Sequence, residues 1–412
     1  MRERFLQTPE NTLFFKKEKE GLLDVCPLFK GQGFLNKEEL LNFFNECSKT
    51  PGLTEEIRAL YRRADDILYG GKIGDLFWNG QLELRRKALG KKSEERVSLL
   101  ELEDADLLNT AIAQPATFIF NEANRMAEER VNGKDSIKPM YYLGNSLGEY
   151  NAFLATGGFK SEDGPDGKPD GGFKNALNLI KRRGRLMHEI CRDKKGNLVG
   201  GLIAVTIPRD LIDKEGSTEE QKKYFGDLIE FLKKRNRKNH FRLYVEADNS
   251  DTQVVFAGKT EDLNRASEWI SKNCEGKVKA VRLAVEGAFH CELMKQAEKD
   301  FARTVRWYLK KGLIKDLNTE VIANTTAIPI KSADEVAAEM IRHLTKSVLW
   351  RQSTEYAKKR GAAYLIEYGK KAVLTKMEDP KTVDIIKGAA IGGAALALLV
   401  GVFAVYSKVK KR

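Results

Sequence analysis

The chain has few of the residues that bind metals or form disulfides. Its 412 residues include five cysteines and four histidines, scattered without the close spacing of a metal site. An odd cysteine count, together with a charged N-terminus that lacks an apolar segment, favours a reducing compartment and argues against secretion. No internal repeat is visible either. We therefore expect a globular protein without disulfides, metal or bound redox cofactor.

Acidic residues are fewer than basic residues. The chain has 71 Lys and Arg against 59 Asp and Glu, a net charge of +12, within an ordinary globular composition of 42% hydrophobic residues. Aromatic residues are not interleaved with the basic run "KKRNRK" (233–238), so the sequence gives little support to a nucleic-acid groove. An acidic protein partner or an anionic membrane explains the excess equally well.

Only one long apolar run is present, near the C-terminus. Residues 388–406, "GAAIGGAALALLVGVFAVY", contain no charged residue, and basic residues stand on both sides. A helix of this length just covers the hydrocarbon core of a bilayer. A buried core helix is the alternative, but core helices rarely lack polar residues for so long. We predict a membrane anchor over 386–407. The flanking lysines leave its orientation open, and we expect the rest of the chain to face the cytoplasm.

The rest of the chain indicates an α/β protein. A strand-like run at 22–29 is followed by helical sequence, and the strand-like "PMYYL" (139–143) leads through a glycine turn into a helix. Such units place their loops at the carboxyl ends of parallel strands. Strands and helices alternate over 197–286 in the order β-α-β-β-α-β, which is the ferredoxin-like pattern. We predict an α/β core formed by 1–196 and 287–380, with a ferredoxin-like subdomain inserted at 197–286.

The pentapeptide "GNSLG" (144–148) lies between the predicted strand and helix. It fits the G-x-S-x-G nucleophile elbow, in which small residues flank a serine on a strained turn. The helix that follows would offer free backbone N–H groups to a developing oxyanion. The pattern is short enough to arise by chance, so an ordinary glycine turn is the alternative. Its position between strand and helix favours Ser146 as a nucleophile.

A serine nucleophile needs a base, and His290 is the best candidate. In "VEGAFHCELM" (285–294) it follows a strand and precedes a helix, where a loop residue reaches the top of a sheet. A structural histidine is the alternative interpretation. The other three histidines lie in helical sequence or beside a basic run.

Eight short motifs together carry a family resemblance. The chain resembles the malonyl-CoA:acyl carrier protein transacylases, the acyltransferases of fatty acid and polyketide synthesis, over about 22–378. The motifs occur in family order and are "FKGQG" (29–33), "QPATF" (114–118), "GNSLGEYNAFLATG" (144–157), "KRRGRLMHE" (181–189), "NSDTQVVFAG" (249–258), "VEGAFHCELM" (285–294), "ANTTAIPI" (323–330) and "LIEYGKKAVLTKM" (365–377). The resemblance implies an α/β-hydrolase-like core with a parallel sheet and an inserted ferredoxin-like subdomain.

The resemblance also implies roles for individual residues. Ser146 matches the acylated serine and His290 its base. The backbone N–H groups of Gln32 and Leu147 match the oxyanion hole. Arg183 matches the arginine that binds the malonyl carboxylate, a role that suits a guanidinium because it pairs with carboxylates through two parallel hydrogen bonds.

Further positions concern selectivity and support. Phe289 matches the residue that narrows the acyl pocket toward malonyl. Asn145 stands where the family usually has histidine, and Leu349 where it often has glutamine. We expect the Leu349 carbonyl to orient the catalytic histidine, because leucine keeps that carbonyl. The first motif also lacks the proline and second glutamine usual around it.

The predicted activity is therefore malonyl transfer from malonyl-CoA to the phosphopantetheine thiol of an acyl carrier protein, through a malonyl-serine intermediate. Two alternatives remain: a thioester hydrolase with the same Ser146–His290 pair, and a membrane-tethered scaffold whose site has decayed. Arg183 favours transfer over hydrolysis.

Overall fold

The computed structural model describes residues 24–374, except 71, 93–94, 135–136, 164–166, 168, 213–216, 236–240, 363 and 370–372. The predicted anchor at 386–407 lies outside the described residues. Within the part of the chain that is described, no helix is long and apolar enough to cross a membrane.

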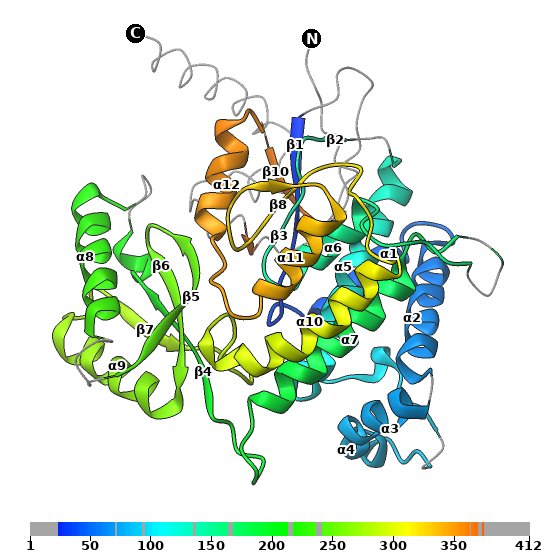
Figure 1. The fold of residues 1–412 in the computed structure, drawn as a ribbon, viewed down its shortest axis with the longest axis horizontal. Helices are drawn as coiled ribbons and strands as arrows, with labels where there is room; N and C mark the ends of the chain where they lie inside the picture. The colour runs from blue at the N-terminus through cyan, green and yellow to red at the C-terminus, as the bar shows by residue number, and fades with distance from the viewer. Residues whose placement is uncertain are drawn as a thin grey trace.

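A small parallel sheet forms the centre of the larger unit (Figure 1). Its strand β1 (Asp24–Phe29) pairs in parallel with β10 (Tyr364–Glu367), β2 (Lys138–Pro139) and β3 (Leu143–Gly144). Residues 25–29 of β1 are buried and most are apolar, as expected for a parallel strand covered on both faces. The sequence thus places this strand at the centre of the core.

Helices surround this sheet. The long helix α5 packs against α7, and α10 packs against both α7 and α11. The helices of this unit are α1 (Lys37–Cys47), α2 (Leu53–Tyr69), α3 (Lys72–Gln81), α4 (Glu83–Ala88), α5 (Thr110–Asn132), α6 (Gly148–Ala155), α7 (Phe173–Ile190), α10 (Lys295–Lys310), α11 (Ala333–Arg342) and α12 (Trp350–Lys359). Short 3-10 turns η1 (Leu99–Glu101), η2 (Asp106–Leu108) and η4 (Glu292–Met294) and the strand pair β8 (Val321–Ile322) and β9 (Pro329–Ile330) complete it.

A second unit lies beside the first, on the left in Figure 1. It contains β4 (Gly200–Thr206), η3 (Arg209–Leu211), α8 (Glu219–Arg235), β5 (Leu243–Ser250), β6 (Gln253–Lys259), α9 (Thr260–Asn273) and β7 (Lys279–Arg282). Its strands form an antiparallel sheet in the order β5-β6-β4-β7. The element order is the β-α-β-β-α-β series that the sequence predicts, and the strand order is the one in which each helix connects two parallel, non-adjacent strands.

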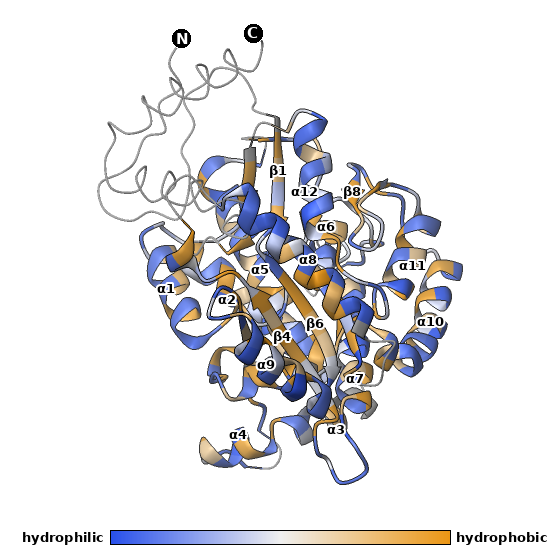
Figure 2. Ribbon diagram, turned by 90° about the vertical axis from the view of Figure 1, so that its left-hand side faces the viewer, coloured by the Kyte–Doolittle hydropathy of each residue, from blue (hydrophilic) through white to orange (hydrophobic). Residues whose placement is uncertain are grey.

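Two hydrophobic cores follow from this arrangement. A main core fills the larger unit, and a smaller core lies between the antiparallel sheet and its two helices α8 and α9. Figure 2 shows the contrast for this unit, with apolar strands β4 and β6 behind the polar outer surface of α9. The other face of the antiparallel sheet turns toward the main core, where Leu202, Ala204 and Ala257 pack.

Candidate active site

Ser146 lies on a strained turn between β3 and α6. Its φ is 49°, in the left-handed region that residues other than glycine rarely occupy. A Cβ atom added to Gly144 would lie 2.0 Å from the carbonyl carbon of Gly148, and one added to Gly148 would lie 2.2 Å from the Phe29 oxygen. Any side chain at either glycine would clash with the backbone, so both positions require glycine. The turn has the geometry of the predicted nucleophile elbow.

The side chain of Asn324 holds this turn in place. Its Oδ1 accepts a hydrogen bond from the Ser146 N–H at 2.8 Å, and its Nδ2 donates to the Gly144 carbonyl at 2.7 Å. The buried carboxylate of Glu149 accepts from the Asn324 N–H at 2.8 Å. The backbone N–H of the serine is thereby occupied, so any oxyanion donor at the elbow must come from the next residue.

His290 is in direct contact with the serine. Its Nε2 lies 2.7 Å from the Ser146 Oγ, and its Nδ1 lies 2.6 Å from the backbone carbonyl of His343. Because a carbonyl only accepts, Nδ1 carries the proton and Nε2 is free to accept one from the serine. Burial, and then the nearby Arg183 cation, lower the pKa of His290 to about 3. The imidazole is thus a neutral base at physiological pH.

The prediction for Leu349 is wrong. His290 is oriented by the carbonyl of His343, six residues earlier. Leu349 precedes α12, and its own carbonyl accepts hydrogen bonds from the backbone N–H and hydroxyl of Ser353, while its N–H donates to Asn324. The reason is that α11 ends at Arg342, so the carbonyl of the next residue, His343, is available to the histidine ring.

The predicted oxyanion donors lie close to the elbow. Leu147 is fully buried at the start of α6, and Gln32 follows Gly31, whose added Cβ would lie 2.8 Å from the Asn145 oxygen. Among the described residues, the backbone N–H groups of Gln32 and Leu147 have no acceptor. The Gln32 side chain is held by Thr110 at 3.2 Å. Two unpaired N–H groups next to the serine are what an oxyanion requires.

Arg183 is a buried cation with unused donors. It is 1% exposed and donates one hydrogen bond, from Nη1 to the Gln114 Oε1 at 2.8 Å. Its Nε and Nη2 meet no acceptor among the described residues, and its guanidinium lies over the Tyr150 ring at 5.3 Å. Burial lowers its pKa, and Tyr150 and Glu149 oppose that shift. Buried charges without partners are costly, and the role of Arg183 in binding an acyl carboxylate stays a prediction.

The two remaining predicted residues lie near the pair. Asn145 is half-buried at the elbow and packs its backbone and side-chain oxygens against Gly31. Phe289 precedes His290, is buried, and folds its ring over Gly287 beside the Cys191 sulfur. The supporting role of Asn145 and the role of Phe289 in acyl selectivity therefore stay predictions.

Four polar residues around the site were not assigned roles from sequence. Asn324 and Gln114 lie within motifs that carry the resemblance, and Glu149 belongs to the elbow motif itself, yet nothing in the spacing shows what they contact. Glu149 lies 3.3 Å from the Nδ1 of His343, and its pKa is raised by burial. Glu246 reaches the site from the second unit. A single charged residue in a strand-like run does not indicate a functional role, so the sequence did not point to it.

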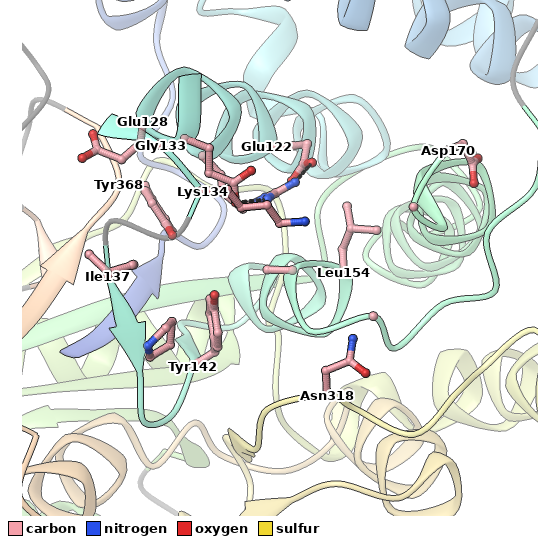
Figure 3. A pocket seen from close by; sticks show the side chains of 16 residues that line it. Glu122, Glu128, Gly133, Lys134, Ile137, Tyr142, Leu154, Asp170, Asn318 and Tyr368 are labelled. Carbon is pink, nitrogen blue, oxygen red and sulfur yellow. Dashed lines mark hydrogen bonds and ion pairs between the residues drawn. The ribbon is translucent and has the colours of Figure 1, made fainter. Parts of the chain in front are cut away.

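A separate cavity of about 380 Å³ lies elsewhere (Figure 3). Charged side chains of α5 and the two tyrosines Tyr142 and Tyr368 line it, together with Leu154 and Asn318. None of the predicted site residues lines this cavity. Among the described residues, no group of three or more His, Cys, Asp or Glu side chains is placed to hold a metal ion.

Known proteins resemble this chain in sequence and in fold. No protein-family model matches the chain. It is 29% identical to the polyketide biosynthesis protein ThaF of Burkholderia thailandensis over 68% of this chain. It is 26% identical to a malonyl CoA-acyl carrier protein transacylase of Bacillus subtilis over 73%, and 28% identical to the polyketide malonyl CoA-acyl carrier protein transacylase BaeC of Bacillus velezensis over 67%. The matches span 20%, 66% and 80% of those proteins, respectively.

Solved structures share the fold. The malonyl CoA-acyl carrier protein transacylase of Burkholderia pseudomallei is 23% identical, with a TM-score of 0.59 over 87% of this chain and 97% of that one. A malonyl-transacylase solved with a type II polyketide acyl-carrier protein is also 23% identical, with a TM-score of 0.59 over 86% and 91%.

The α/β fold of this chain is similar to that of solved acyltransferases. More particularly, the chain is similar to the malonyl CoA-acyl carrier protein transacylases, and the resemblance predicted from the eight motifs is confirmed.

Proposed function

We propose that this protein transfers a malonyl group from malonyl-CoA to the phosphopantetheine thiol of an acyl carrier protein. The Ser146–His290 contact at 2.7 Å supports acyl transfer through the serine. Relatives in sequence and fold carry this activity in their names, and one was solved with an acyl-carrier protein.

In the first half-reaction, the Ser146 Oγ attacks the thioester carbonyl while its proton passes to the Nε2 of His290. The negative charge that forms on the carbonyl oxygen is stabilised by the N–H groups of Gln32 and Leu147. The C–S bond then breaks, coenzyme A leaves with the proton from His290, and malonyl-serine remains.

The second half-reaction reverses these steps with a different thiol. The carrier protein's thiol gives its proton to His290 and attacks the acyl carbonyl. The ester bond to Ser146 breaks, and the serine recovers the proton. The thioester formed replaces the one broken, so no external energy source is needed.

The buried guanidinium of Arg183 is the main support for malonyl as the acyl group. Its two unpaired nitrogens are buried, which suits a free carboxylate on the acyl group far better than an apolar acyl chain. An acetyl or longer alkyl group would leave this cation without a partner, and that cost disfavours such substrates.

Intact-protein mass spectrometry tests the proposal. After brief incubation with malonyl-CoA, wild-type protein should gain a malonyl group that Ser146→Ala does not. Addition of an acyl carrier protein should discharge the adduct and yield malonyl carrier protein. No adduct with malonyl-CoA or acetyl-CoA contradicts the proposal, and rapid release of free malonate without a carrier protein would instead indicate a hydrolase.

We propose in addition that residues 386–407 anchor the protein to a membrane, with the catalytic part facing the cytoplasm. The uncharged sequence of 388–406 and the basic residues on both sides support this.

A further inference from the structure

Glu246 is a buried acid that the second unit points at the catalytic pair. Its Oε1 lies 3.8 Å from the Nε2 of His290, the same nitrogen that contacts Ser146. The side chain is buried, and it comes from β5 rather than from the unit that holds the serine and histidine.

A β-bulge in β5 brings the residue after Glu246 to the same side of the sheet as Glu246. Val245 pairs with Phe256, and Ala247 pairs with the very next partner residue, Val255, so Glu246 is the extra residue in β5. Val245 packs on the smaller core, and strict alternation would send Ala247 there as well. Ala247 packs on the main core instead. Alternation from Val245 already places Glu246 on the side of the main core, and the bulge brings Ala247 to that side as well.

The strand is also fixed to the segment that orients His290. The Val348 N–H donates to the Glu246 carbonyl at 2.8 Å, and the Asp248 N–H donates to the Val348 carbonyl at 2.9 Å. This bridge lies just after His343, whose carbonyl holds the other nitrogen of the ring. Both ring nitrogens of His290 are thus contacted by groups that one main-chain bridge ties together.

The site has a clear need for an anion here. When His290 takes the serine proton it becomes a buried cation with a neutral carbonyl on Nδ1 and the Arg183 cation nearby. His343 packs on the ring at 4.6 Å and, because burial lowers its own pKa, it is neutral and offers no counter-charge. Among the described residues, Glu246 is the acid within ion-pair distance of His290.

We propose that Glu246 is a positioning residue whose carboxylate stabilises the imidazolium that His290 forms during acyl transfer. It does so from the Nε2 side, in place of a carboxylate on Nδ1. The inference rests on the proposed use of Ser146 and His290 for acyl transfer, but not on the identity of the acyl group.

The effect should depend on pH in a defined direction. Burial raises the pKa of Glu246 to about 8, so the fraction of carboxylate grows as the pH rises toward and past 8. His290, with its depressed pKa, stays neutral through this range. Stabilisation by Glu246 should therefore be largest at high pH.

The test compares wild type, Glu246→Gln and Asp248→Asn. The amide keeps the shape of Glu246 but carries no charge. Asp248 is the matched control, because it lies on the same strand but its carboxylate pairs with Arg351 at 2.8 Å rather than with His290. Two readouts are needed: the rate of malonyl-serine formation, and the rate at which a fluorophosphonate probe labels Ser146, which needs the base but no acyl-CoA.

We expect Glu246→Gln to slow both reactions about tenfold at about pH 8.5 and clearly less at about pH 6.5, with the KM for malonyl-CoA little changed. Asp248→Asn should follow the wild-type profile. Equal labelling rates for Glu246→Gln and wild type at the higher pH, or a defect that does not vary with pH, would overturn the inference. If malonyl-CoA forms no adduct while the labelling defect persists, the proposed function fails and the role of Glu246 stands.

Discussion

The Nδ1 of His290 donates its proton to the backbone carbonyl of His343 at 2.6 Å, so a peptide group rather than a carboxylate orients the candidate base. A main-chain partner fixes the tautomer without adding negative charge. The charge balance of the site then depends on side chains further out, namely Arg183, Glu149 and Glu246.

The first prediction concerns acyl selectivity. Replacing Arg183 by Ala should slow malonyl loading by about a hundredfold, because a charged hydrogen-bonding partner of the substrate carboxylate is lost. Acetyl loading should change much less. The measurement is the ratio of the two loading rates by quenched mass spectrometry, with Arg185→Ala as the control, since Arg185 pairs with Glu189 on the surface of α7. Equal losses for both acyl groups would remove the role assigned to Arg183.

A second prediction concerns the oxyanion hole. Gly31→Ala should reduce kcat by about 10- to 100-fold, because the new Cβ would lie 2.8 Å from the Asn145 oxygen and must push the Gln32 N–H away from the elbow. KM should change less than kcat. Gly226→Ala on α8 is the control, because a Cβ there meets nothing within 4 Å. A Gly31→Ala enzyme with normal kcat would contradict the assignment of Gln32.

A third prediction concerns stability in acid. Burial keeps the pKa of His343 well below 6.5 in the folded protein, so between its folded and unfolded pKa values the unfolded chain binds more protons. Its contribution to stability is present above pH 6.5 and is lost as the pH falls. Protonation of this single histidine in the unfolded chain should lower the free energy of unfolding by about 1 kcal/mol between about pH 7 and pH 5.5.

His343→Phe should remove that part of the pH dependence, because the ring no longer titrates. The measurement is the free energy of unfolding by urea at both pH values for the variant and wild type. The groups facing this histidine are Glu149, Tyr150, Arg183, Arg342 and His290, and none of them is substituted in the comparison. An identical pH dependence in the two proteins would show that His343 is not neutral in the folded state.

A fourth prediction concerns the C-terminal apolar run. Deletion of residues 386–412 should move the protein from the membrane fraction to the supernatant after cell lysis, with malonyl loading retained. Removal of the basic tail alone, residues 408–412, is the control and should leave the protein with the membranes. Full-length protein that stays in the supernatant without detergent would contradict the anchor.

Much of the fold and the candidate catalytic pair could be predicted from local sequence. Ser146 and its glycines form one short motif, whose steric requirement acts between neighbouring residues. His290 stands at the junction of a strand-like run and a helix, where a loop residue reaches the sheet edge. The β-α-β-β-α-β series could be predicted because each of its elements has a clear period.

The supporting contacts could not be predicted in the same way. Asn324 is 178 residues from the serine that it holds, and only the folded chain brings them together. The partner of His290 is a main-chain carbonyl, which any residue offers, so sequence cannot distinguish position 343 from 349. A bulge likewise depends on the partner strand, so the side that Ala247 faces follows from pairing with β6 rather than from its own neighbours.

The pairing of β1 with β10 has a consequence for how the chain is made. The antiparallel unit is contiguous, from β4 to β7, and all its strands are available once residue 282 has left the ribosome. By contrast, β1 is synthesised early but waits for β10 (Tyr364–Glu367) before its edge is covered. Such distant pairing is slow and leaves an apolar strand edge open to other chains. Nascent chains that stop before residue 364 should therefore aggregate through β1, even though they already contain every candidate catalytic residue.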